Sequence, residues 1–239
     1  MKVQPYHLCD SDLNFQIDAA YHDHKYDFGY DDRFHAGGIA FWRDQNVGVL
    51  GVDASFIGLR SQVDGYPIGA SDLGSFFRAG VRGEYFVGDD FTLGAGIGHI
   101  GGDLFGQNMA GFDGNLWARA YATNNLAIIA RLDVGRYMWS TETFNKWAVS
   151  GDAEYLLPGH PISIFAGAKY ANIIDDFGGG AVSDDFIEEF AGLKVYFGSS
   201  GHGETLASHQ RNNTLDNTSV LFEKTPEILD AALGSLFIP

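Results

Sequence analysis

The sequence predicts an all-β fold: a closed up-and-down antiparallel barrel of about ten strands, with a short C-terminal amphipathic helix after a polar linker. Ten segments show the period-two alternation of apolar and polar residues that is typical of strands. Residues that favour turns separate these segments. The 239 residues include 32 Gly but only 6 Pro, and aromatic residues make up 14%. This composition is typical of barrels and sandwiches.

We expect the strands at 15–25, 34–43, 47–60, 74–87, 91–100, 114–123, 126–137, 146–156, 161–172 and 187–197. Tight hairpin turns are expected at Asp44-Gln45-Asn46, Gly88-Asp89-Asp90, Thr123-Asn124-Asn125 and Pro158-Gly159-His160. The connections at 61–73, 101–113, 137–145 and 172–186 are expected to be longer. Short and long connections thus alternate, which places short turns at one end of the barrel and long loops at the other. A soluble sandwich has no reason to sort its loops in this way.

The two faces of each strand differ sharply in polarity. In 74–87, Phe77 and Val81 share one face, and Arg78 and Arg82 share the other. If the apolar face points inward, the protein is a soluble ligand carrier; if the charged face points inward, the apolar face meets lipid. Aromatic residues gather near strand ends on the apolar face, as in the interfacial girdles of membrane barrels. They are Trp42, Tyr85, Trp147, Tyr155, Tyr170 and Phe197. This distribution favours the inward charged face.

A charge network is therefore expected inside the barrel. Its members are Arg78, Arg82, Glu84, Arg119, Arg131, Asp133, Asp152, Glu154, Lys169 and Lys194. Buried charges are tolerated when they are paired and hydrogen-bonded, and a barrel of about this size leaves room for little more than side chains. We expect an ion-paired interior with little or no free pore.

The last predicted strand resembles the assembly signal of bacterial outer-membrane β-barrels. Gly192, Val195 and Phe197 match the glycine, hydrophobic and aromatic positions of that signal, although Phe190 stands where the family usually has a polar residue. With the alternating connections, the motif makes the chain similar to the small porin-like outer-membrane barrel families. The resemblance implies a bacterial outer-membrane location, with the lipid bilayer and the outer-membrane assembly machinery as partners.

Three regions are expected: an N-terminal extension at 1–13, a transmembrane barrel at 14–197, and a periplasmic polar tail at 198–239. In the tail, a flexible linker over 198–219 is expected to precede a helix that starts at Thr225-Pro226-Glu227. Ile228, Leu229, Leu233 and Leu236 follow at helical spacing. This segment could plug the barrel, dock a neighbouring subunit, lie on the membrane, or be a frayed tail. We expect it to be the contact site if the protein has a partner.

The first residues carry no apolar segment of the kind a signal peptide needs. An outer-membrane location then requires this sequence to be a mature or engineered form. The missing signal otherwise favours a soluble barrel that binds an apolar ligand. The sequence contains no run of about 18 apolar residues, so it predicts no membrane-spanning helix. Because Cys9 is the single cysteine, the chain cannot form an intramolecular disulfide.

Some residues have the chemistry of a site without a complete motif. His22, His24 and His35 are candidates for a transition-metal site. His22 and His24, with nearby Asp residues, are also candidates for a hydrolase at the barrel rim. Asp175-Asp176 and Asp184-Asp185 resemble a calcium loop but lack its regular spacing. Gly94-Ala95-Gly96-Ile97-Gly98 lies within a strand, so it predicts close packing in the wall rather than a nucleotide loop. We expect no cofactor and no enzymatic activity.

The net charge is −16, and no basic stripe for nucleic acid is present. The main functional hypothesis is an outer-membrane barrel with a structural or partner-interaction role and a plugged, charged interior. The alternatives are a narrow cation-preferring channel for small solutes, a rim-based hydrolase acting on lipid or peptide, and a soluble ligand-binding barrel. The direction in which the apolar face points discriminates the last of these from the others.

Overall fold

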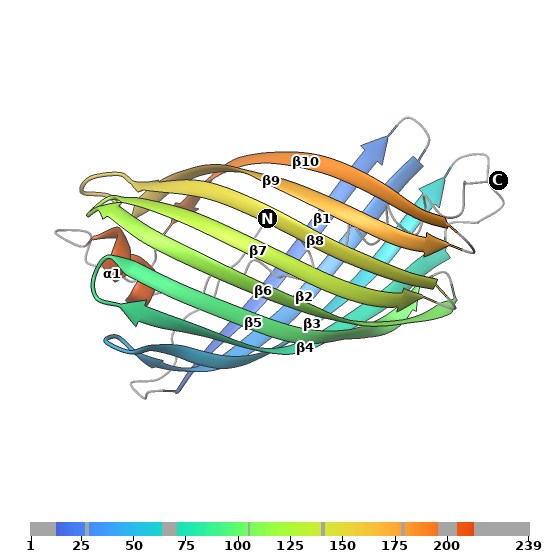
Figure 1. The fold of residues 1–239 in the computed structure, drawn as a ribbon, viewed down its shortest axis with the longest axis horizontal. Helices are drawn as coiled ribbons and strands as arrows, with labels where there is room; N and C mark the ends of the chain where they lie inside the picture. Colours follow the sequence, from blue (N-terminus) through green and yellow to red (C-terminus); the bar gives the residue numbers. More distant parts are fainter. Residues whose placement is uncertain are drawn as a thin grey trace.

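The computed structural model describes residues 13–26, 29–63, 71–104, 106–139, 142–177, 180–195 and 205–212. Ten antiparallel strands form one sheet in chain order, and one short helix lies at one end of it (Figure 1). The elements are β1 (Leu13–Tyr26), β2 (Gly29–Asp44), β3 (Gly48–Val63), β4 (Ser71–Val87), β5 (Phe91–Leu104), β6 (Gln107–Thr123), β7 (Leu126–Trp139), β8 (Glu142–Leu156), β9 (Ile162–Phe177), β10 (Gly180–Val195) and α1 (Leu206–Asn212). The predicted all-β, up-and-down antiparallel fold is confirmed.

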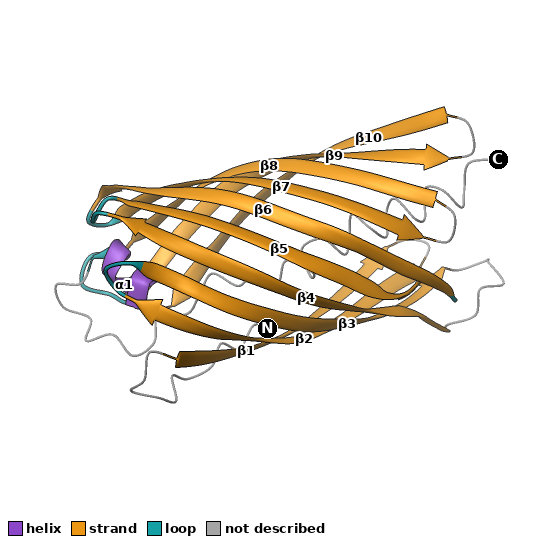
Figure 2. Ribbon diagram, turned by 60° about the horizontal axis from the view of Figure 1, so that its bottom comes forward, coloured by secondary structure: helices purple, strands orange, loops and turns teal. Residues whose placement is uncertain are grey.

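The predicted closure of the sheet is not confirmed. Each strand pairs with its neighbours in the chain, and among the described residues β1 and β10 form no ladder with each other. The sheet is strongly curled, so that β1 to β3 pass behind the later strands, but it remains open along its two edges (Figures 1 and 2). Closure would require pairing between the two strands that lie farthest apart in the chain, and local sequence patterns carry no signal for it.

The four tight turns are confirmed at 45–47, 88–90, 124–125 and 157–161, which lie between strands at one end of the sheet, here called the short-turn end. The Asp44 carboxylate accepts the backbone N–H groups of Asn46 and Val47 at 2.8 and 3.2 Å. Gly88 and Gly159 have φ values of 59° and 76°. Glycine is the residue that adopts this left-handed conformation without a steric penalty.

The prediction of long loops at the opposite end, here called the far end, is wrong for the connections at 101–113, 137–145 and 172–186, where two residues separate the strands. The connection predicted at 61–73 remains longer, since β3 ends at Val63 and β4 begins at Ser71, and residues 64–70 lie outside the described residues. β1 and β2 pair as far as Tyr26 and Gly29, and β9 and β10 pair as far as Phe177 and Gly180. Only two residues separate the strands in each of these hairpins. The glycine and acidic residues that indicated loops lie instead in long strand ends. Glycine and aspartate favour turns in isolation, but cross-strand pairing holds these residues in extended conformation.

The apolar face of the sheet points outward and the polar face inward. On β4, Phe77, Val81 and Tyr85 are exposed, whereas Arg78 and Arg82 are buried. The same alternation continues on β7, where Ile128, Leu132 and Val134 are exposed. The wall of the fold is therefore inverted relative to a soluble barrel, in which apolar side chains fill the interior.

The interior nevertheless contains apolar residues at both ends. Near the short turns, Ile39, Phe41, Val49 and Phe86 form a buried cluster. Toward the far end, the inward positions include the buried residues Ile57, Phe76, Ile100, Tyr137 and Phe144. Charged side chains lie between these two apolar layers. The interior thus has three layers, and apolar residues lie on both sides of the predicted charge network.

The helix α1 lies within residues 198–219, where we predicted a flexible linker, and this prediction is wrong for Leu206–Asn212. The predicted helix over 226–236, with Ile228, Leu229, Leu233 and Leu236, lies outside the described residues. No helix among the described residues is long and apolar enough to cross a membrane.

Candidate functional site

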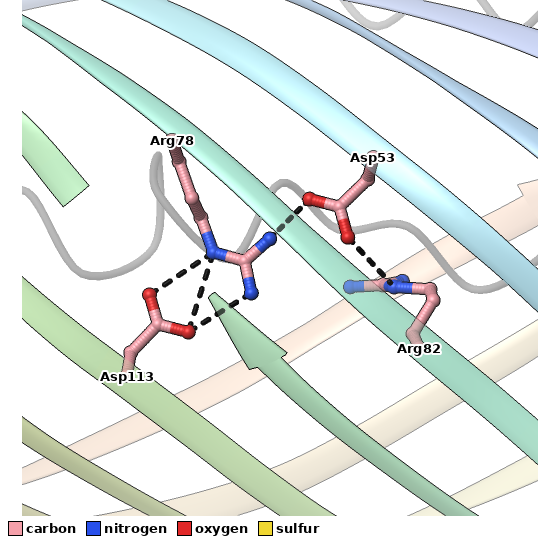
Figure 3. Close-up of polar contacts among 4 residues, drawn as sticks. All are labelled: Asp53, Arg78, Arg82 and Asp113. Atoms are coloured by element: carbon pink, nitrogen blue, oxygen red, sulfur yellow. Dashed lines mark hydrogen bonds and ion pairs between the residues drawn. The ribbon is translucent and has the colours of Figure 1, made fainter. Parts of the chain in front are cut away.

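The centre of the interior is a cluster of four charged residues (Figure 3). Arg78 on β4 donates its Nε and Nη2 groups to the Asp113 carboxylate on β6, with the closest contacts at 3.0 and 2.9 Å. Its Nη1 group contacts the Asp53 carboxylate on β3. The other oxygen of Asp53 lies 3.7 Å from Nε of Arg82. All four residues are buried, so the guanidinium groups and carboxylates neutralise each other within the fold.

The contact between Arg78 and Asp113 crosses β5, which lies between the two strands that carry them. Gly98 on β5 makes the crossing possible, because a Cβ atom there would lie 2.5 Å from the Arg78 guanidinium carbon. A Cβ atom at Gly96 would lie 2.7 Å from the Asn115 side-chain oxygen, and one at Gly94 would overlap the Trp117 ring. The glycine repeat therefore leaves the inner face of β5 bare and lets neighbouring side chains lie across it.

A second interior cluster is centred on Glu154 of β8, whose side chain is 1% exposed. One carboxylate oxygen accepts a hydrogen bond from Ser163 on β9 at 2.5 Å. The other oxygen lies 3.0 Å from Nζ of Lys194 on β10 and 2.9 Å from Nε2 of Gln210 on α1. Glu154 thus joins the last three strands to the helix that follows them.

α1 docks against the short-turn end, where Figure 1 shows it beside the hairpin turns. The fully buried Leu206 packs with Tyr121, Ala127 and Leu156, and its N–H donates to the carbonyl of Asn124 in the β6–β7 turn at 2.7 Å. Thr205 precedes the helix, and its hydroxyl accepts the N–H of Ser208 at 3.1 Å, as an N-cap does.

Arg211 attaches the end of α1 to the β4–β5 turn. Its Nη2 group donates to the carbonyls of Gly88 and Phe91 at 2.7 and 3.2 Å. Its guanidinium carbon lies 4.7 Å from the ring centroid of Phe86 and 5.7 Å from that of Tyr121. Together with Leu206 and Gln210, this residue makes α1 a stopper that bridges β4 to β8 at one mouth of the interior.

The outer wall carries aromatic residues at two levels. Phe34 and Trp42 on β2, Phe77 and Tyr85 on β4, and Trp147 and Tyr155 on β8 are exposed pairs, each eight residues apart. Their exposed fractions lie between 38% and 59%. Between the members of each pair, the outward positions hold only Ala, Val or Gly. They are Ala36, Gly38 and Ala40 on β2, Ala79, Val81 and Gly83 on β4, and Val149, Gly151 and Ala153 on β8.

The aromatic level nearer the far end includes Phe34, Phe77 and Trp147, and is here called the far aromatic level. Beyond it the strands continue, and polar side chains appear on their outer face. Arg60, Asn108, Arg136, Asn145 and Asp185 are exposed there. The outer surface between the two aromatic levels is here called the apolar band. Among the described outward positions of this band, one carries a charged side chain, the exposed Glu189 on the edge strand β10. Ile187, two residues away, pairs with Tyr170 of the far aromatic level, so Glu189 lies close to that level.

All ten residues predicted for the charge network lie on the inner face. Arg78, Arg82, Arg119 and Glu154 are buried, and Glu84, Arg131, Asp133, Asp152, Lys169 and Lys194 are half-buried. Sequence analysis missed Asp53 and Asp113, which hold Arg78. Both could have been found, because each lies at a strand position whose side chain points inward, next to apolar residues that face outward.

The weak metal candidates are only partly described. His22 and His24 lie on β1, opposite Arg33 and Asp31 of β2, and their side chains lie outside the description. His35 is buried on β2 opposite Ala20. Among the residues that the structure describes, no group of three or more potential metal ligands occurs.

The remaining predicted positions lie on β10 or beyond it. Gly192 faces the ring of Phe165, Val195 ends β10, and Phe197 lies outside the described residues. The acidic pairs compared with a calcium loop are strand residues instead: Asp184 and Asp185 pair with Ile173 and Asn172. The Asp185 carboxylate accepts a hydrogen bond from the Asn172 amide at 2.5 Å.

No protein-family model matches this sequence, and a search of curated proteins finds no match either.

Proposed function

We propose that this chain is a bacterial outer-membrane β-barrel that conducts no solute and has a structural or partner-interaction role. The observation that carries the proposal is the apolar outer band between two aromatic levels, spaced eight residues apart on β2, β4 and β8. Aromatic girdles at both interfaces of an apolar band are the characteristic of membrane barrels. Exposed apolar surface of this extent would be unfavourable in water.

The dimensions of the band suit an outer membrane. Eight residues of a strand span about 26 Å at about 3.3 Å per residue. At a tilt of about 40°, this corresponds to about 20 Å along the barrel axis, and the aromatic rings add to the height at each level. The apolar band of outer-membrane barrels is about 25 Å tall.

A bilayer location requires the sheet to be closed, because unpaired backbone groups cannot be satisfied in hydrocarbon. β1 and β10 are antiparallel, since the strand number is even and every neighbouring pair is antiparallel. The proposal therefore includes a β1–β10 ladder in the membrane. Glu189 on β10 lies close to the far aromatic level, and near an interface a carboxylate costs little.

The layered interior supports a non-conducting barrel over the channel alternative. Apolar side chains fill both ends, α1 covers one mouth, and paired charges fill the middle. The same polar middle disfavours a soluble carrier, which needs an apolar cavity inside. The surfaces left for contacts are the polar hairpins beyond the far aromatic level and the short-turn end around α1.

The first test is whether the purified full chain requires detergent to remain folded and monodisperse, with heat-modifiable gel migration as the readout of the folded barrel. Both properties are expected. A chain that is monodisperse and folded in plain buffer would overturn the membrane proposal. Planar-bilayer recordings then test the second part: we expect no unitary conductance, whereas steady cation-selective currents would favour the narrow channel.

A further inference from the structure

The short-turn mouth of the interior is covered by a segment that lies outside the sheet. α1 begins eleven residues after the end of β10, and its contacts reach β4, β6, β7, β8 and the β4–β5 turn. A helix of seven residues is far below the length at which isolated helices are stable in water, about 12–15 residues. The helical state of α1 therefore depends on docking, so docking and folding of this segment are one coupled event.

We propose that α1 docks once the sheet is complete, that it covers the buried apolar residues at the short-turn end, and that it can undock while the sheet stays folded. In this sense α1 is a releasable stopper. Two observations carry this inference. The first is that its docking surface is assembled from several strands and two turns, so that no single hairpin offers it. The second is the Glu154 carboxylate, on which Gln210 of α1 and Lys194 of the last strand meet.

The docking of α1 depends on β10 because β10 carries Lys194. Without β10, Glu154 would lack the positive charge that Lys194 places 3.0 Å from the carboxylate oxygen that also accepts Gln210. A buried carboxylate without a paired charge is unfavourable, so the polar half of the α1 site is complete only when the last strand is in place. The apolar half, formed by Tyr121, Ala127 and Leu156, is supplied by β6, β7 and β8.

Release of α1 is not expected to open a channel. The far-end layer, which includes Phe76, Ile100 and Phe144, lies at the opposite end of the interior from α1 and is expected to remain buried. Undocking would instead expose Ala127, Leu156 and the Glu154 carboxylate to the compartment at the short-turn end. The inference does not depend on what surrounds the outer wall, so it stands or falls separately from the proposed membrane location.

Cysteine accessibility tests the inference in the full-length chain, with the native Cys9 replaced by serine. A reporter is placed at Ala127, which is fully buried in the Leu206 cluster, and a matched reporter at Ala148, which is fully buried on the inner face of β8 toward the far end. A membrane-impermeant maleimide is applied to the folded protein. Both reporters are expected to be protected when α1 is native.

In Leu206→Asp, we expect labelling of the Ala127 reporter to accelerate at least tenfold while the Ala148 reporter stays protected. Leu206→Met, which preserves the apolar contact, is expected to keep both reporters protected. Lys194→Met is expected to accelerate labelling at Ala127 as well, although it does not alter α1. If the Ala127 reporter stays protected in a folded Leu206→Asp protein, or if both reporters become labelled equally, α1 is not a separable stopper. If Lys194→Met has no effect, the dependence on β10 is wrong.

Discussion

Arg78 on β4 and Asp113 on β6 are joined by a bidentate contact that passes over the bare inner face of β5. The same guanidinium contacts Asp53 on β3, so one cation neutralises two buried carboxylates from the two sides of its own strand. This geometry makes Arg78 the residue on which the charged middle layer depends.

We expect Arg78→Met to destabilise the fold by about 3–5 kcal/mol, because it leaves Asp53 and Asp113 buried without their shared cation. Arg136→Met is the matched control. Arg136 is exposed beyond the far aromatic level, so its replacement should change the free energy of unfolding by no more than about 0.5 kcal/mol. Urea unfolding followed by tryptophan fluorescence measures both. Equal effects of the two substitutions would contradict the role of Arg78.

A double-mutant cycle resolves the pair. Adding Asp113→Asn to Arg78→Met should recover part of the lost stability, since the second change removes one of the two buried carboxylates that Arg78 neutralised. Strictly additive effects of the two substitutions would show that Arg78 and Asp113 do not interact in the folded protein.

The bare face of β5 should be intolerant of a methyl group. Gly98→Ala places a Cβ atom 2.5 Å from the Arg78 guanidinium carbon, and overpacking of this kind costs about 1–3 kcal/mol. Gly151→Ala is the control, because the nearest atom to a Cβ there is 3.8 Å away. Its effect on the urea midpoint should be small. A neutral Gly98→Ala would mean that Arg78 does not cross β5.

The outer band makes a prediction about charge. Leu116→Arg, at an exposed position on β6, should destabilise the protein in lipid vesicles by about 2–4 kcal/mol if this position lies near the middle of the bilayer. Asn145→Arg, at an exposed position beyond the far aromatic level, should have almost no effect. The comparison is made from urea unfolding in the same vesicles. If Leu116→Arg leaves the free energy of unfolding in vesicles unchanged, the outer wall lies in water and not in lipid.

Hydrogen exchange tests the proposed ladder between β1 and β10. If β1 and β10 pair in the membrane, the amides of both strands that point away from β2 and β9 should exchange at least a hundredfold more slowly than those of an unpaired strand. The amides of β6, which is paired on both sides, provide the reference in the same sample. Rapid exchange along both edges of the detergent-solubilised protein would show that the sheet stays open.

The period-two alternation by itself indicated about ten antiparallel strands and placed residues such as Arg78 and Glu154 on the polar face, because side-chain direction in a strand depends only on position along it. The four short turns were equally local, since Asp44 and the left-handed Gly88 and Gly159 act within a few residues. The far-end hairpins were misjudged because glycine and aspartate favour turns in isolation, whereas cross-strand hydrogen bonds kept them in ladders.

Only the tertiary structure decided which residues meet inside. Asp53, Arg78 and Asp113 come from three strands, and their contact depends on the bare face of β5 and on the curl of the sheet. The docking of α1 was likewise beyond the sequence pattern, because a helix of seven residues has no stability of its own and forms on a surface that several distant strands build together.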